Sequence, residues 1–188
     1  MLWSVGLRGL SDYAYQCANS TDCGSQISDV LANQTAWIQA VQPGAPMILY
    51  LWDELLELLA SGHLVVPPGV SVIFTDAGDG FIRVNANVSR YANGVYFHTM
   101  MYNGFANQLT ELVPVDRIFT QVGNFSAHAN STLAFVLNLS DMLPVPMSSE
   151  AVLRMMWDPS PYVGGDPLAS ALAYCAFSAR ARASRGCH

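Results

Sequence analysis

Short stretches that are apolar throughout alternate along the chain with stretches in which apolar residues recur every three or four positions. The first pattern predicts buried strands at residues 2–7, 47–51, 70–75, 94–98 and 133–138. The second predicts helices at residues 27–41, 53–61, 106–112, 116–125, 148–157 and 168–177. Continuously apolar strands separated by helices are typical of an α/β fold with a parallel sheet.

Polar or ionisable side chains follow or end each predicted strand. In chain order they are Arg8 and Asp12, Trp52 and Glu54, Asp76 and Asp79, His98, and then Asn138 and Asp141. The carboxyl ends of parallel strands point the same way, so we expect these groups to converge on one face, as in a (β/α)8 barrel. Five strands cannot close such a barrel, and the pattern fades beyond Pro161. We therefore predict part of a (β/α)8 barrel over residues 1–160, followed by a divergent C-terminal segment at 161–188.

Carboxylates, an arginine and an aromatic ring on one face are typical of a site that cleaves glycosidic bonds, which needs two carboxyl groups. An arginine suits a sugar that carries a carboxylate, because the guanidinium binds it bidentately. Trp52 can stack on a sugar ring. Each residue also has a structural explanation: an ion pair for Arg8, a helix N-terminus for Glu54, a turn for Asp76 and Asp79. His98 can likewise be a histidine of the core. Asn138 can be a turn residue, and Asp141 can be a helix cap.

Composition narrows the classes of function. The chain of 188 residues is 52% hydrophobic and 12% charged, and its net charge is -6. This composition excludes a disordered tail and argues against nucleic-acid binding, which needs a basic face. No apolar run reaches the roughly 18 residues of a membrane helix, and no CxxC or His/Cys cluster indicates a metal. We expect no membrane partner, no metal and no cofactor.

Asn-x-Ser/Thr acceptor sequences point to a secretory history although no signal peptide follows Met1. The six acceptors are Asn19, Asn33, Asn87, Asn124, Asn130 and Asn138. Four cysteines allow three pairings, of which the local pairs Cys17–Cys23 and Cys175–Cys187 are favoured. We therefore expect a fragment of a secreted protein.

Several segments, in order over residues 2–160, resemble glycoside hydrolase family 115, the xylan α-glucuronidases. They are WSVGLRGLSD at 3–12, ILYLWDE at 48–54, VVPPGVSVIFTD at 65–76, GVYFHT at 94–99, ANQLTE at 106–111, NLSDMLPV at 138–145 and MMWD at 155–158. Each motif alone is modest, and the ordered set is fairly specific.

The resemblance implies an inverting enzyme that removes α-1,2-linked glucuronic or 4-O-methylglucuronic acid from xylan without a metal or cofactor. It implies Asp12 and Glu54 as the catalytic carboxylates, with acid and base unassigned. It also implies that Arg8 and His98 contact the uronate or a neighbouring sugar, and that Asp76 belongs to the same site.

We predict a carbohydrate-binding role for the other strand-end residues, which are Trp52, Asp79, Asn138 and Asp141. The partner is then a glucuronylated polysaccharide, and we expect a homodimer of the full-length protein. Three departures from the family pattern (Ala77-Gly78, Met101 and Leu143) put the substrate's identity in doubt. They leave open a truncated or inactive carbohydrate-binding barrel fragment, or an α/β protein with no sugar role.

Overall fold

The strands of the chain form one sheet with the order β1-β2-β3-β4-β5. The computed structural model describes residues 1–10, 13–76, 78–84, 91, 93–99, 113–128, 132–139, 146–158, 160–161, 165–166, 169–171 and 174. The chain divides into two compact units. Unit 1 comprises Met1–Thr75, Arg83–Tyr96 and Asn130–Ala134, and unit 2 comprises Asp76–Ile82, Phe97–Ala129 and Phe135–His188.

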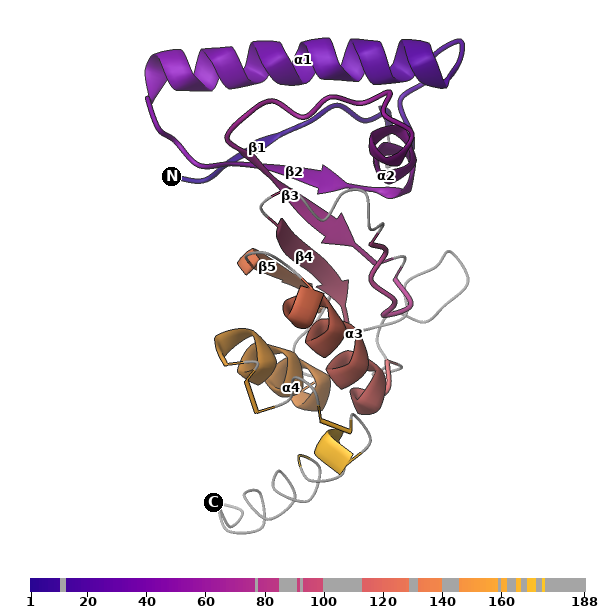
Figure 1. Ribbon diagram of the computed structural model, residues 1–188, viewed down its shortest axis with the longest axis vertical. Coiled ribbons are helices and arrows are strands. Elements are labelled where there is room, and N and C mark those ends of the chain that lie inside the picture. Colours follow the sequence, from indigo (N-terminus) through magenta and orange to yellow (C-terminus); the bar gives the residue numbers. More distant parts are fainter. Residues whose placement is uncertain are drawn as a thin grey trace. The chain divides into compact units, whose positions relative to one another are not determined.

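Strands β1 (Trp3–Val5), β2 (Met47–Leu51), β3 (Val70–Thr75) and β4 (Asn93–His98) pair in parallel, each with the next along the chain. Strand β5 spans Thr132–Asn138. These bounds confirm the predicted strands to within one residue, except that β1 is shorter than residues 2–7. Parallel neighbours require a crossover connection, and α1 and α2 supply the first two (Figure 1).

Helix α1 (Ser20–Val41) is longer than the predicted helix, which began at residue 27. Its start is set by Asn19, whose side chain accepts a hydrogen bond from the backbone N–H of Asp22 (3.0 Å). The first turns are polar, so apolar periodicity could not detect them, whereas an asparagine N-cap is a recognised start signal. Ile27 and Leu31 form the buried face of the helix.

Helix α2 (Asp53–Ala60) follows β2 after a single residue, Trp52. Leu55, Leu58 and Leu59 are its buried residues. They share the core of unit 1 with strand residues that are almost fully buried, namely Met47, Leu49, Leu51, Val72 and Phe74. Because β2 and α2 are so closely joined, the first turn of α2 is fixed at the carboxyl end of β2.

Unit 2 contains helices α3 (Val115–His128) and α4 (Pro146–Trp157), which pack against each other. Ile118 and Val122 of α3 and Met155 of α4 are buried. The helix predicted at 148–157 is confirmed, but it begins at Pro146, so Ser148 is a buried residue within the helix and not its N-cap. Proline is favoured in the first turn of a helix, where its missing N–H leaves no bond unmade. The predicted helix at 106–112 lies outside the described residues.

Candidate active site

The carboxyl ends of β1 and β2 bring a cation and an anion together in unit 1. Arg8 lies three residues beyond β1, and Glu54 is the second residue of α2. Because Val5 pairs with Leu49, the two strands end at the same edge. The Nε of Arg8 donates to Oε1 of Glu54 at 2.8 Å, and each side chain is 24% exposed. The half-buried ion pair is therefore a direct product of parallel strand order.

Three aromatic rings lie beside this ion pair. Trp52 stacks on Tyr50 with ring centroids 6.4 Å apart and meets Tyr96 edge-on at 5.2 Å. The guanidinium carbon of Arg8 lies 5.2 Å from the centre of the Trp52 ring, within the range of a cation–π contact. The cluster thus combines a guanidinium, which can bind a carboxylate, with a carboxylate and aromatic faces, which can stack on a sugar ring.

Gly94 of β4 lies at a close approach to Ile73 and Ala134. A Cβ at this position would lie 2.4 Å from Cδ1 of Ile73 and 2.4 Å from the backbone oxygen of Ala134. Both distances are far below van der Waals contact, so the close approach requires glycine. Gly94 is two residues before Tyr96 in the same strand, so a larger side chain at Gly94 would disturb the strand that carries that ring.

A second ion pair lies at the start of α2. Asp53, the first residue of the helix, pairs with Arg83, and both side chains are substantially exposed. Acidic residues in the first turn of a helix are stabilised by its dipole, which also applies to Glu54. Sequence reasoning missed this pair, because Arg83 is far away in the chain and no pattern linked the two residues.

In unit 2 the side chains of Asp76 and His98 form a buried pair. Asp76 follows β3 directly and His98 is the last residue of β4. Oδ1 of Asp76 contacts Nδ1 of the His98 ring and accepts from the backbone N–H of His98 (3.3 Å), while Oδ2 accepts from the backbone N–H of Gly80 (2.8 Å). The Asp76 side chain is completely buried. These bonds show that Asp76 orients the imidazole and holds the loop after β3.

Asp79 lies in a turn, which agrees with the explanation of this residue as a turn residue. Its Oδ1 accepts from the backbone N–H of Phe81 (3.1 Å), and Gly78 and Gly80 on either side have positive φ. Its backbone oxygen accepts from Arg117 of α3 (2.9 Å). A short Asp side chain that accepts from the N–H two residues on is a common way to stabilise a turn.

The remaining predicted residues divide into two groups. Asn138 is the last residue of β5, half-buried, and its backbone oxygen accepts from the N–H of Thr99 (3.3 Å) in unit 2. Asp12 and Asp141 lie outside the described residues. The structure therefore joins Arg8, Trp52 and Glu54 in unit 1.

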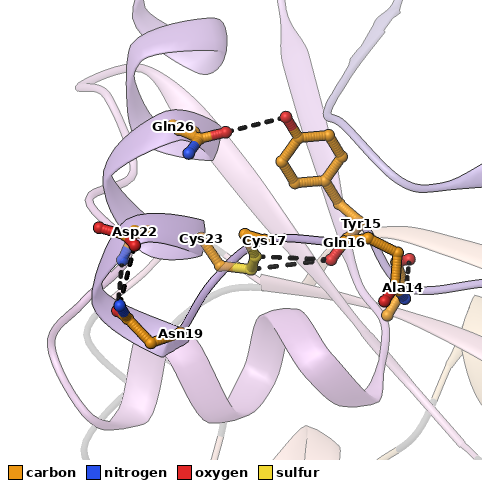
Figure 2. The surroundings of a disulfide bond; sticks show 8 residues. All are labelled: Ala14, Tyr15, Gln16, Cys17, Asn19, Asp22, Cys23 and Gln26. Atoms are coloured by element: carbon orange, nitrogen blue, oxygen red, sulfur yellow. Dashed lines mark hydrogen bonds between the residues drawn. A yellow bond between two sulfur atoms is a disulfide. The ribbon is translucent and has the colours of Figure 1, made fainter.

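A disulfide bond between Cys17 and Cys23 ties the loop after β1 to the first turn of α1 (Figure 2). It confirms the predicted local pairing, while Cys175 and Cys187 lie outside the described residues. The backbone oxygen of Tyr15 lies 3.6 and 3.7 Å from the two sulfur atoms, and its phenol donates to Oε1 of Gln26 (2.8 Å). The disulfide and this hydrogen bond therefore hold the segment around Tyr15 against the first two turns of α1.

Within the part of the chain that the structure describes, no three His, Cys, Asp or Glu side chains are grouped so that they could hold a metal ion. Among the same residues, no helix is both long enough and apolar enough to cross a membrane.

The family model described as "Glycosyl hydrolase family 115" matches residues 1–178. One similar solved structure is described as a family GH115 4-O-methyl-α-glucuronidase with specificity for decorated arabinogalactans. Its sequence identity is 21% and its TM-score is 0.75, and the match covers 85% of this chain and 22% of that one. No curated protein matches. The likeness confirms the predicted fold, an α/β part of a (β/α)8 barrel with parallel strands.

Proposed function

Since the chain belongs to glycosyl hydrolase family 115, we propose that it forms part of a catalytic barrel that removes α-1,2-linked glucuronic or 4-O-methylglucuronic acid from a polysaccharide. Xylan is the substrate that the sequence resemblance implies. The matching solved structure is described as specific for decorated arabinogalactans, which makes a glucuronylated arabinogalactan the other candidate. The chain spans 22% of the length of that protein.

The cluster of Arg8, Trp52 and Glu54 is the observation that carries this proposal. A uronic acid differs from a neutral sugar by its carboxylate, and a guanidinium binds a carboxylate more strongly than it binds hydroxyl groups. Arg8 is held by Glu54 (2.8 Å) and by the face of Trp52 (5.2 Å), so its orientation is fixed before a substrate arrives. Such preorganisation reduces the entropy lost on binding. Glu54 is then one hydrogen-bond length from the group that binds the uronate.

Hydrolysis requires two carboxyl groups, and we assign Glu54 and Asp12 to this pair. In an inverting reaction one protonates the oxygen of the leaving sugar while the other activates a water molecule on the opposite face. Room for that water requires a separation of about 6.5–9.5 Å between the two carboxyl groups. The assignment of acid and base between Glu54 and Asp12 stays open.

The test is release of glucuronic acid from glucuronylated oligosaccharides derived from xylan and from arabinogalactan. We expect Glu54→Gln to abolish release, because glutamine can neither donate nor accept the required proton. The matched control is Glu150→Gln, which makes the same change in an exposed ion pair on α4. Equal rates of release by Glu54→Gln and the unmodified chain would contradict the assignment.

A second candidate is a carbohydrate-binding fragment without catalysis. It is favoured by the departures from the family pattern at Ala77, Gly78 and Leu143. It predicts that glucuronic acid binds to the chain, that binding is weakened in Arg8→Ala, and that no glucuronic acid is released. Measuring binding and release on the same preparation separates the two candidates.

A further inference from the structure

The outer face of helix α1 carries an exposed tryptophan. Trp37 is 82% exposed, and Val41, one turn further along, is 81% exposed. Strand β1 and helix α2 contact the other side of α1, where Ile27 and Leu31 are buried (Figure 1). Tryptophan is on average one of the more buried residues, so a ring this exposed requires an explanation.

An acceptor sequence for N-linked glycans begins one turn before Trp37 on the same face of α1. It consists of Asn33-Gln34-Thr35. The Asn33 side chain is exposed, and it makes no hydrogen bond within the part of the chain that the structure describes. Residues four apart on a helix are neighbours, with about 5–6 Å between their Cβ atoms. Because helical side chains lean toward the N-terminus, we expect the indole of Trp37 to lean toward Asn33.

The hydroxyl of Thr35 makes no hydrogen bond in the folded chain. Its Oγ1 atom is buried and has no partner among the described residues. A buried hydroxyl without a partner lowers stability, and valine would fill the same volume without that cost. The acceptor sequence, in contrast, requires a hydroxyl at this position. Threonine at position 35 is therefore explained by the acceptor sequence and not by packing.

The other acceptors in the described part of the chain have different surroundings. Asn19 caps α1, and its amide is engaged, because Oδ1 accepts from the backbone N–H of Asp22 (3.0 Å) and Nδ2 donates to the carboxylate of Asp22 (2.8 Å). Asn138 is half-buried at the end of β5, and Asn124 lies on α3 in unit 2. Of these four acceptors, Asn33 is the one with an exposed tryptophan one turn further along the helix.

The disulfide bond at the start of α1 bears on the compartment. Cys17 and Cys23 are bonded to each other. Disulfide bonds form and persist in oxidising environments such as the lumen of the endoplasmic reticulum, and N-linked glycans are attached in the same lumen. The disulfide bond and the acceptor sequences thus favour the same compartment, although they are independent features of the chain.

We propose that Asn33 carries an N-linked glycan whose first sugar packs against the indole of Trp37. In the transfer, Nδ2 of Asn33 attacks the anomeric carbon of a lipid-linked oligosaccharide diphosphate. The new C–N bond replaces the C–O bond to the diphosphate, which leaves with its lipid, and the amide loses one proton. The C–H face of the attached N-acetylglucosamine then covers one face of the Trp37 ring, which removes apolar surface from water. This modification is independent of the proposed function.

The first measurement is the occupancy of position 33 in the full 188-residue chain, produced in yeast behind a cleavable secretion signal and recovered from medium and cells. Glycans are removed by a peptide N-glycosidase in heavy-oxygen water, which converts each glycosylated asparagine to labelled aspartate, and peptides are analysed by mass spectrometry. We expect label at Asn33 and none in Thr35→Val, which keeps the Asn33 side chain. Absence of label at Asn33 in the unmodified chain overturns the proposal.

The second measurement shows whether the first sugar covers Trp37. Endoglycosidase H trims yeast glycans but leaves the first N-acetylglucosamine on asparagine. Hydroxyl-radical footprinting then gives the oxidation rate of each tryptophan in the trimmed chain and in Thr35→Val. We expect Trp37 to be oxidised about twofold faster in Thr35→Val, because a sugar on one face of the ring leaves the other face exposed. Trp157 is 92% exposed at the end of α4, a helix without an acceptor sequence, and should be oxidised equally in both.

A second variant separates the loss of the sugar from a change in the fold. Asn33→Gln removes the glycan at an exposed position and leaves Thr35 in place, so Trp37 should be oxidised as fast as in Thr35→Val. Circular dichroism spectra of both variants should match that of the trimmed chain. Equal oxidation of Trp37 in the trimmed chain and in both variants overturns the contact between the sugar and the ring.

Discussion

The Arg8–Glu54 ion pair can be tested by a double-mutant cycle. The substitutions are Arg8→Met, which keeps most of the aliphatic stem, and Glu54→Gln, which keeps the volume. The cycle isolates the energy of the pair, because contacts that each side chain makes with other residues cancel. The contact with Trp52, for example, is lost in both the single and the double variant that lack Arg8.

The expected magnitude follows from the geometry and the burial. Exposed ion pairs contribute about 0.2–1 kcal/mol, and hydrogen bonds to charged groups about 1.5–3 kcal/mol. Both side chains here are 24% exposed and the N···O distance is 2.8 Å. We therefore expect a coupling energy of about 1–2 kcal/mol, between the exposed and the buried case. Arg8→Met alone should cost about 0.5–1 kcal/mol more, because the cation–π contact is lost as well.

The assay is urea unfolding of the chain and the three variants, followed by circular dichroism. The free energy of unfolding comes from linear extrapolation, and equal slopes show that the same surface is exposed in each variant. A coupling energy below about 0.3 kcal/mol, the usual error of additivity for independent sites, would refute the ion pair as an organising contact. In that case Glu54 would have to be held by its helix alone.

Three other changes probe the surroundings of the site. Gly94→Ala should lower the free energy of unfolding by about 1–3 kcal/mol, because the added methyl group overpacks the strands, and unchanged urea unfolding would contradict the close approach seen here. Replacing both Cys17 and Cys23 by serine should cost about 2–3 kcal/mol through loop entropy and should make limited proteolysis of the loop faster, while unaltered cleavage would argue against the role given to the disulfide. Asp76→Ala should cost at least about 2 kcal/mol, because it removes a buried carboxylate that accepts hydrogen bonds from the backbone N–H groups of His98 and Gly80. If the chemical shifts of the His98 ring are the same in that variant as in the unmodified chain, other groups orient the ring.

The sequence by itself determined the order and the type of the elements. Apolar runs of five or six residues next to proline and glycine, at 47–51 and 70–75, favour buried strands, and both strands have those bounds in the structure. Parallel order then implies that neighbouring carboxyl ends lie together, which is why the proximity of Arg8 and Glu54 could be expected. The local disulfide was likewise predictable, because only six positions separate the two cysteines.

Contacts between distant segments were decided by the tertiary structure alone. The edge-on contact of Tyr96 with Trp52 and the ion pair of Asp53 with Arg83 depend on how separate strands and loops are placed against one another, and no local sequence pattern encodes that placement. The burial of Asp76 was also decided by the tertiary structure. An aspartate after a strand has the same sequence pattern whether its carboxylate is exposed to water or paired with a histidine. Hydrophobic periodicity shows which face of a helix or strand is buried. The pairing of polar side chains depends instead on how helices, strands and loops pack against one another, so only the folded structure reveals these pairs.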